Sequence, residues 1–138
     1  MKGCYCLIIH INDSKAIRVG KLGKIKFKKG YYVYVGSAMN GLESRLNRHL
    51  SDSKKLHWHV DYLLKNAEIA DIIYNVDKKV ECEVSQYISA KSEGIDGFGC
   101  SDCDCESHLY YFKSKFEAVE CIEGTYASIG VPCDFYAI

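Results

Sequence analysis

The stretch GYYVYVGSA at residues 30–38 is rich in tyrosine and valine, the residue types that favour β-strands, and it predicts a strand over residues 31–36. Upstream, GCYCLIIHIN at residues 3–12 is an almost continuous apolar run that predicts a buried first strand. Downstream, leucines recur every four residues at positions 42, 46 and 50, which predicts a helix over residues 40–50. Two strands followed by a helix therefore form the expected centre of the fold.

The rest of the chain alternates between short strand and helix patterns. Asn40 is the expected cap of the first helix, and Glu43 lies three positions later, as in a capping box. The remaining expected strands are 16–21, 24–28, 69–76 and 109–112, the helices are 57–64, 80–91 and 115–123, and the irregular parts are a loop at 97–105 and a tail at about 124–138. This order predicts an α+β fold, with a small mixed or antiparallel central sheet flanked by helices, in a single domain over residues 1–138.

The net charge of zero conceals a strong asymmetry along the chain. Residues 1–79 hold 15 Lys and Arg against 7 Asp and Glu, whereas residues 80–138 hold 3 against 11. An insert at about residues 13–30 is the most basic part, and a nucleic-acid backbone would be contacted there by Lys21, Lys24, Lys26 and Lys28. The alternative is a solvated hairpin whose lysines protect a strand edge against aggregation. The cluster alone does not separate these two interpretations.

The chemistry that we expect of the eight cysteines depends on the cellular compartment that the sequence suggests. The opening apolar run is too short for a membrane span or a signal peptide, so we expect a cytoplasmic protein without a membrane partner. Thiols in a reducing cytosol stay free, bind metal or perform chemistry. The oligomeric state is left open.

Three short motifs occur in a fixed order: GCY at residues 3–5, YVGSA at residues 34–38, and then Arg45 and His49 on the predicted helix. In this the chain resembles the GIY-YIG nuclease superfamily. It is most similar to the Uri-type (DUF123-like) branch, which is sometimes fused to a DNA repair glycosylase. The resemblance covers most of residues 1–112, and its matching segments are residues 19–23, 30–38, 45–50, 57–64, 81–83 and 98–112.

The resemblance implies a divalent-metal-dependent endonuclease that hydrolyses phosphodiester bonds. It implies a catalytic role for Tyr5, which would orient or deprotonate the attacking water, while Tyr34 and His49 would position water and phosphate. Arg45 offers a planar fork to phosphate oxygens. Taken singly, each of these residues also fits an ordinary structural role, so the proposal depends on their meeting at one place.

The family site is completed by a glutamate from a later helix, which would hold Mg²⁺ or Mn²⁺. Glu81 and Glu83 are both candidates, and because they point about 200° apart on a helix, only one of them can face the site. We also expect Ser37 and Arg48 to contact the nucleic-acid backbone, with DNA favoured over RNA as the partner.

A second dense signal is the set Cys100, Cys103, Cys105 and His108. Thiolates and imidazole at such spacing can close a tetrahedral Zn²⁺ site, and Cys82 can substitute for one of the four. The competing interpretation is a loop of reduced cysteines, with Cys82 buried as a small apolar residue.

Three hypotheses about function remain. The first is a metal-dependent endonuclease acting on DNA, with a place in repair. The second is a nucleic-acid-binding module without catalysis, and the third is a zinc-stabilised interaction domain. Mn²⁺-dependent nicking, salt-sensitive binding without products, and bound zinc without DNA affinity would distinguish them.

Overall fold

The centre of the fold is a five-stranded sheet in the order β6-β4-β1-β5-β7. The computed structural model describes residues 1–100 and 103–138, so Ser101 and Asp102 of the predicted loop at residues 97–105 lie outside the described residues. The strands are β1 (Gly3–Ile11), β4 (Gly30–Ala38), β5 (Glu68–Val76), β6 (Leu109–Phe112) and β7 (Asp134–Phe135). Each neighbouring pair is antiparallel. The sheet is thus the antiparallel form of the predicted α+β fold.

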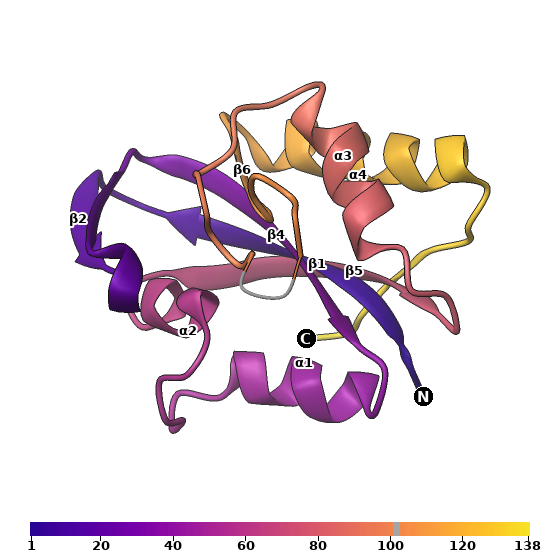
Figure 1. The fold of residues 1–138 in the computed structure, drawn as a ribbon, viewed down its shortest axis with the longest axis horizontal. Helices are drawn as coiled ribbons and strands as arrows, with labels where there is room; N and C mark the ends of the chain where they lie inside the picture. The colour runs from indigo at the N-terminus through magenta and orange to yellow at the C-terminus, as the bar shows by residue number, and fades with distance from the viewer. Residues whose placement is uncertain (101–102) are drawn as a thin grey trace.

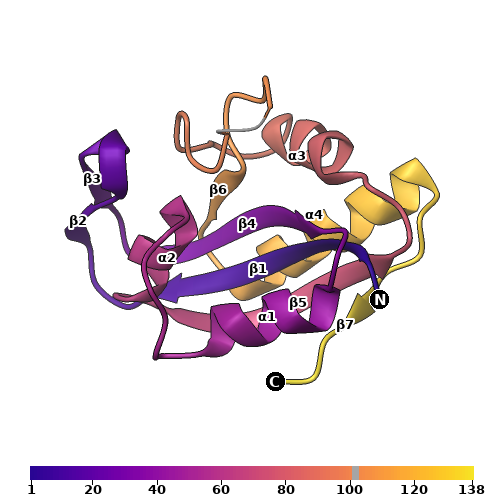
Figure 2. The ribbon, with the colours of Figure 1, turned by 60° about the horizontal axis from the view of Figure 1, so that its bottom comes forward.

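Four α-helices cover the two faces of this sheet in the described part of the chain. They are α1 (Leu42–Leu50), α2 (His59–Leu64), α3 (Glu81–Ser89) and α4 (Lys115–Ile129). Figure 1 shows α1 and α2 on one face and α3 and α4 on the other, and the turned view in Figure 2 agrees. Among the described residues no helix is both long enough and apolar enough to span a bilayer.

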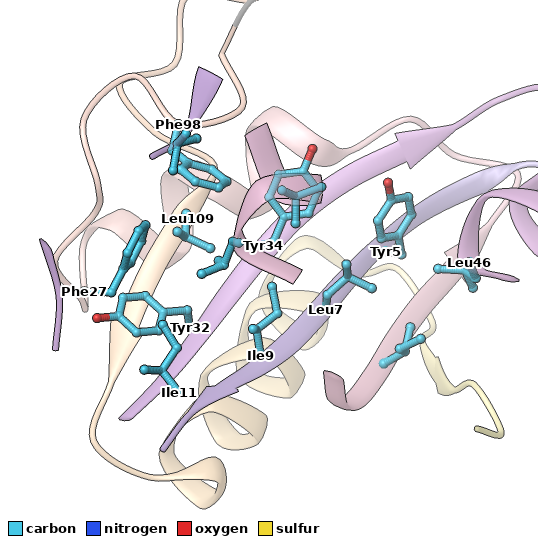
Figure 3. Packing of buried hydrophobic residues seen from close by; sticks show 14 of the residues in the cluster. Tyr5, Leu7, Ile9, Ile11, Phe27, Tyr32, Tyr34, Leu46, Phe98 and Leu109 are labelled. Carbon is cyan, nitrogen blue, oxygen red and sulfur yellow. The ribbon is translucent and has the colours of Figure 1, made fainter. Parts of the chain in front are cut away.

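Successive residues of β1 point to opposite faces, so the continuous apolar run serves two cores at once. Tyr5, Leu7 and Ile9 belong to the core beneath α1 and α2. The residues between them, including Cys6 and Ile8, belong to the core beneath α3 and α4. Figure 3 shows the hydroxyls of Tyr5 and Tyr34 pointing to the same side, beyond the aliphatic side chains of that first core.

The basic insert forms a separate two-stranded hairpin. Its strands are β2 (Lys15–Arg18) and β3 (Lys24–Phe27), and the short 3-10 helix η1 (Gly20–Leu22) lies between them. Ile17 and Phe27 are buried and anchor the hairpin to the core beneath α1 and α2, whereas the lysines are exposed.

Two predicted boundaries were wrong. Asn40 does not cap α1: the cap position is Gly41, no side chain caps the helix, and the Leu42 N–H donates to the Met1 carbonyl over 2.8 Å. Residues 124–129 of the expected irregular tail instead continue α4, which is followed by Gly130 as the C-cap with a left-handed φ of 71°. Glycine adopts this conformation without steric cost, so Gly130, not Gly124, stops the helix.

Candidate active site and metal centre

A cavity of about 400 Å³ lies where β1, β4, α1 and α3 meet. Four side chains predicted to act together line it, namely Tyr5, Tyr34, Arg45 and Glu81, and Ser37 is beside them. The other lining residues are Val35, Gly36, His57, Trp58, His59, Lys79, Gly99, Cys103 and His108. The structure therefore brings together Tyr5 and Glu81, which are 76 positions apart in the sequence.

Glycines create the space in which Tyr5 lies. Tyr5 is paired with Gly36 across β1 and β4, and a Cβ at position 36 would be 2.5 Å from the Tyr5 hydroxyl oxygen. A Cβ at Gly3 would be 1.9 Å from the carbonyl oxygen of Asn75. Both distances are far below van der Waals contact, so the glycines of the two strand motifs are required by close approach.

Tyr5 is held from behind by His49. Its hydroxyl oxygen is 2.8 Å from His49 Nε2, and both side chains are buried. Burial raises the pKa of Tyr5 to about 12, against the opposing effect of the Arg45 charge. Burial also lowers the pKa of His49 to about 3, so the imidazole is neutral near pH 7. His49, which we expected to position water and phosphate, contacts Tyr5 from outside the cavity lining.

Arg45 reaches the cavity across the face of an indole ring. Its guanidinium carbon is 4.4 Å from the centroid of Trp58, and Nη1 donates to the Ser37 carbonyl oxygen over 3.0 Å. Such a cation–π contact stabilises the guanidinium group and restricts its orientation. In the described residues Arg45 forms no ion pair with an acidic side chain, so its charge is available to an anion in the cavity.

Glu81, and not Glu83, faces the cavity. The Ser37 hydroxyl donates to Glu81 Oε1 over 2.9 Å, which ties the start of α3 to β4. Glu83 is exposed and is absent from the cavity lining, as the helical geometry requires once Glu81 points inward. The ambiguity between the two glutamates is resolved in favour of Glu81 as the group near Tyr5 and Arg45.

Arg48 does not face the cavity, although we expected it to contact a nucleic-acid backbone. It donates two hydrogen bonds to the buried carboxylate of Asp61, over 2.9 and 3.0 Å, and its guanidinium carbon lies 4.3 Å from the Trp58 centroid. Burial tends to raise the pKa of Asp61, but the Arg48 hydrogen bonds and two backbone N–H donors lower it below the usual value. Arg48 is thus committed to this ion pair.

A cluster of four potential metal ligands adjoins the cavity. Cys82, Cys103, Cys105 and His108 present ligand atoms that all lie within 4.8 Å of one another. His108 Nε2 is 3.0 Å from Cys103 Sγ, while its Nδ1 is 2.7 Å from the Ser85 hydroxyl oxygen. This Cys₃His cluster has the composition of a metal-binding site.

Cys82 takes the place in the Cys₃His cluster that Cys100 was expected to fill. Cys100 is outside the four-residue group, and its Sγ donates to the Phe98 carbonyl oxygen over 3.4 Å. Burial, followed by the proximity of Cys82 and Cys103, raises the pKa of the Cys105 thiol. Without a cation the Cys105 thiol therefore resists ionisation, whereas a bound metal ion would favour its thiolate.

The family described as "Domain of unknown function DUF123" matches residues 4–131. The chain belongs to this family. No curated protein and no solved structure matches it. The matched range of the DUF123 domain includes every residue of the cavity and of the Cys₃His cluster.

The basic hairpin of the DUF123 domain stands beside the cavity but does not line it. Phe98 connects the two regions, because its ring is 6.5 Å from that of Phe27 in β3 and 6.1 Å from that of Tyr34. Lys28 is 3.9 Å from a carboxylate oxygen of Glu93. The exposed lysines of the hairpin are Lys15, Lys21, Lys24, Lys26, Lys28 and Lys29.

Sequence reasoning missed three residues at this site of the DUF123 domain. Trp58 stacks against both arginines of α1. Ser85 holds His108, and its position three residues after Cys82 was a usable signal, because helical neighbours share a face. Lys79 also lines the cavity, two residues before Glu81, and nothing in its local sequence distinguished it from the other lysines.

Proposed function

We propose that this DUF123 domain is a metal-dependent endonuclease of the GIY-YIG type that hydrolyses phosphodiester bonds in DNA. The supporting observation is the convergence of Tyr5, Tyr34, Arg45 and Glu81 on one cavity, in the arrangement that the sequence resemblance implies. A phosphodiester is an anion whose negative charge increases as it is cleaved, so a cavity with a free guanidinium and a carboxylate for a metal ion suits this reaction.

The residues present fit a hard divalent cation at Glu81. In the described residues the carboxylate accepts a hydrogen bond from Ser37 and forms no ion pair with a basic side chain, so it faces the cavity with its charge uncompensated. Mg²⁺ and Mn²⁺ are held in such sites by one or two carboxylates and keep open positions for water and phosphate. When bound, such an ion would neutralise charge on the phosphate and stabilise the leaving oxygen.

Arg45 and Lys79 supply the positive charge that the chain itself contributes to phosphate binding. The planar guanidinium can bind two phosphate oxygens at once, and Trp58 and the Ser37 carbonyl already hold it in place. Lys79 adds a point charge on the same cavity wall. Arg45 and Lys79 therefore direct binding energy at a phosphate.

The Tyr5–His49 contact orients the tyrosine hydroxyl. His49 Nδ1 has no hydrogen-bond partner within the described part of the chain. A buried N–H without a partner is unfavourable, so we assign the proton to Nε2, which then donates to the Tyr5 oxygen. The hydroxyl proton of Tyr5 is thereby directed into the cavity, where it can bind and position the attacking water.

The experiment is a cleavage assay on DNA and RNA of varied structure, with and without Mn²⁺ or Mg²⁺. Replacement of Glu81→Gln or Arg45→Ala should lower the rate by roughly 100- to 1,000-fold, the effect of removing one charge-stabilising group. Glu83→Gln is the matched control on the same helix and should leave the rate unchanged. Circular dichroism should show the fold of all three variants intact. Cleavage by Glu81→Gln at the wild-type rate would contradict the proposal.

A nucleic-acid-binding module without catalysis is the second candidate, and the exposed lysines of the hairpin favour it. It predicts DNA binding whose affinity falls steeply with salt, while no product forms with any metal ion. Partial loss of binding on replacing Lys24 and Lys26 by serine, without cleavage by the parent protein, would favour this alternative.

We also propose that the Cys₃His cluster holds Zn²⁺ as a structural ion. Four ligands, three thiols and one imidazole, match the closed tetrahedral sites that zinc occupies. The Ser85 hydroxyl fixes His108 through Nδ1 and leaves Nε2 for the ion, as partners of ligating histidines commonly do.

All eight cysteines lie in the described residues and none forms a disulfide, which supports a location in the reducing cytoplasm.

Metal analysis of protein purified without chelator tests the zinc assignment. One zinc ion per chain is expected, and its absence would refute the assignment. Stoichiometric zinc together with no affinity for DNA or RNA would favour the third hypothesis, a zinc-stabilised interaction domain.

A further inference from the structure

The Cys₃His cluster and the cavity share a wall. Cys103 and His108 belong to the cluster and also line the cavity that contains Tyr5 and Arg45. Cys82 belongs to the cluster and directly follows Glu81 in the first turn of α3. The residue that would hold the catalytic metal ion is therefore covalently adjacent to a ligand of the cluster.

The cluster joins segments that come from different parts of the chain. Cys82 is on α3, Cys103 and Cys105 are in the loop before β6, and His108 immediately precedes that strand. His108 is additionally fixed to β4, because its carbonyl oxygen accepts a hydrogen bond from the Val35 N–H over 2.9 Å. An ion bound by all four side chains would thus fasten the start of α3 to a segment already attached to the sheet.

Val80 and Val84 bury the start of α3 in the core, and Ser85 contacts His108, but the first turn itself has few other polar restraints. Val80 occupies the cap position and provides no side-chain cap, so the first backbone N–H groups of the helix lack the usual capping acceptor. The Cys4 thiol accepts a hydrogen bond from the Val80 N–H over 3.2 Å, and Ser37 donates to Glu81. These two contacts are weak compared with a metal–thiolate bond at the next residue.

We propose that zinc bound by Cys82, Cys103, Cys105 and His108 positions Glu81, so that binding of a hard divalent cation in the cavity depends on occupation of the thiolate site. This inference rests on the proposed function, since it takes Glu81 as the ligand of that second ion. Cys82 and its partners act here as positioning residues: they lie against the cavity but hold the carboxylate in place through the helix. The two ions are coupled because one short helical turn carries a ligand for each.

The chemistry of the two ligand sets keeps the ions apart. Thiolates select zinc and similar soft cations, whereas a single carboxylate with open coordination positions suits Mg²⁺ or Mn²⁺. Excess Mn²⁺ therefore does not replace zinc in the cluster, and each site can be filled and measured separately.

The test compares Mn²⁺ affinity in zinc-loaded and zinc-depleted protein, by calorimetry or by paramagnetic resonance of the free ion. Loss of zinc should weaken Mn²⁺ binding by about 10- to 100-fold, the range seen when a supporting group of a metal site is lost. Cys105→Ser should reproduce this loss. Cys133→Ser, which removes a cysteine outside the cluster, should retain both one zinc ion and wild-type Mn²⁺ affinity.

A second variant guards against simple unfolding. Cys105→His restores a zinc ligand and should recover both zinc and Mn²⁺ binding, and cobalt substituted into the wild-type site should show the visible absorption of tetrahedral thiolate coordination. Equal Mn²⁺ affinity with and without zinc, or a wild-type protein that binds no zinc, would overturn the inference while the nuclease proposal stands. Both proposals fail if zinc-loaded wild-type protein does not bind Mn²⁺. They also fail if the Glu81→Gln variant binds Mn²⁺ as tightly as wild type.

Discussion

The two sides of the cavity are held together by different chemistry. On the side of α1 and α2, Arg48 and Asp61 form a two-bonded ion pair, and Trp58 carries the guanidinium groups of both Arg45 and Arg48. On the side of α3 and the loop before β6, three thiols and an imidazole converge without an opposing charge of their own. The first side is complete within the chain, whereas the second side would gain its stabilising charge from the proposed zinc ion.

This contrast assigns different sensitivities to the two sides. The α1–α2 side should respond to mutation of its charged pair and to pH, because protein side chains carry its stabilising charges. The α3 side should respond to metal availability and to the residues that orient the metal ligands. Three measurements test this difference between the two sides of the cavity.

The largest effect is expected from Arg48→Ala. The variant leaves the fully buried Asp61 carboxylate without its cation, and removal of one partner from such a pair costs about 3 kcal/mol or more. Urea unfolding should show this loss in the free energy of unfolding, whether or not zinc is present. Arg18→Ala, at an exposed position of the hairpin, is the control and should change the free energy by less than about 0.5 kcal/mol. A loss of similar size in both variants would remove the special status of the pair.

A smaller effect is expected on the other side from Ser85→Ala. This change removes the hydrogen bond to His108 Nδ1 but keeps all four zinc ligands. Zinc affinity, measured by competition with a chromophoric chelator, should fall by about 10- to 100-fold. Ser89→Ala lies one turn further along α3, where the serine is exposed, and it should leave zinc affinity unchanged. Unchanged affinity in Ser85→Ala would separate His108 from the metal site.

The third effect, the smallest when counted per pH unit, concerns the dependence of stability on pH. Burial lowers the pKa of His49 to about 3 from the ordinary value of 6.5, so between these values the unfolded chain binds a proton that the folded protein does not. The free energy of unfolding should therefore be highest above pH 6.5 and should fall by about 1.4 kcal/mol per pH unit on acidification through this window. Urea titrations of wild type and His49→Asn at several pH values measure the difference. Parallel pH profiles would show that folding does not lower the pKa of His49.

The sequence predicted those helices and strands correctly whose pattern lies within a short stretch of the chain. The tyrosine- and valine-rich run became β4, and the leucines at every fourth position became the buried face of α1. The errors arose where distant residues decide. The start of α1 is capped by the carbonyl of Met1, a contact that no short window of sequence contains. The helix expected over residues 115–123 continues to Ile129, and the short strand β7 within the expected tail is defined by its pairing with β5.

The site was predictable in part for the same reason. Tyr5, Tyr34 and Arg45 occur in motifs with a fixed order, so the sequence identified them before their meeting place was known. The choice between Glu81 and Glu83 required the rotation of α3 about its axis, and the choice of Cys82 over Cys100 required the path of the loop before β6. Both are properties of tertiary packing, which spacing along the chain does not determine.

The place of β1 in the sheet has a consequence for how the chain is made. This strand leaves the ribosome before the other strands of the domain, yet it lies in the middle of the sheet, between β4 and β5. Its apolar residues stay without partners until β4 and then β5, which ends at Val76, have been synthesised. Such long-range pairing slows folding and leaves an aggregation-prone apolar strand exposed in the meantime. Nascent chains truncated before Val76 should therefore depend most strongly on chaperones.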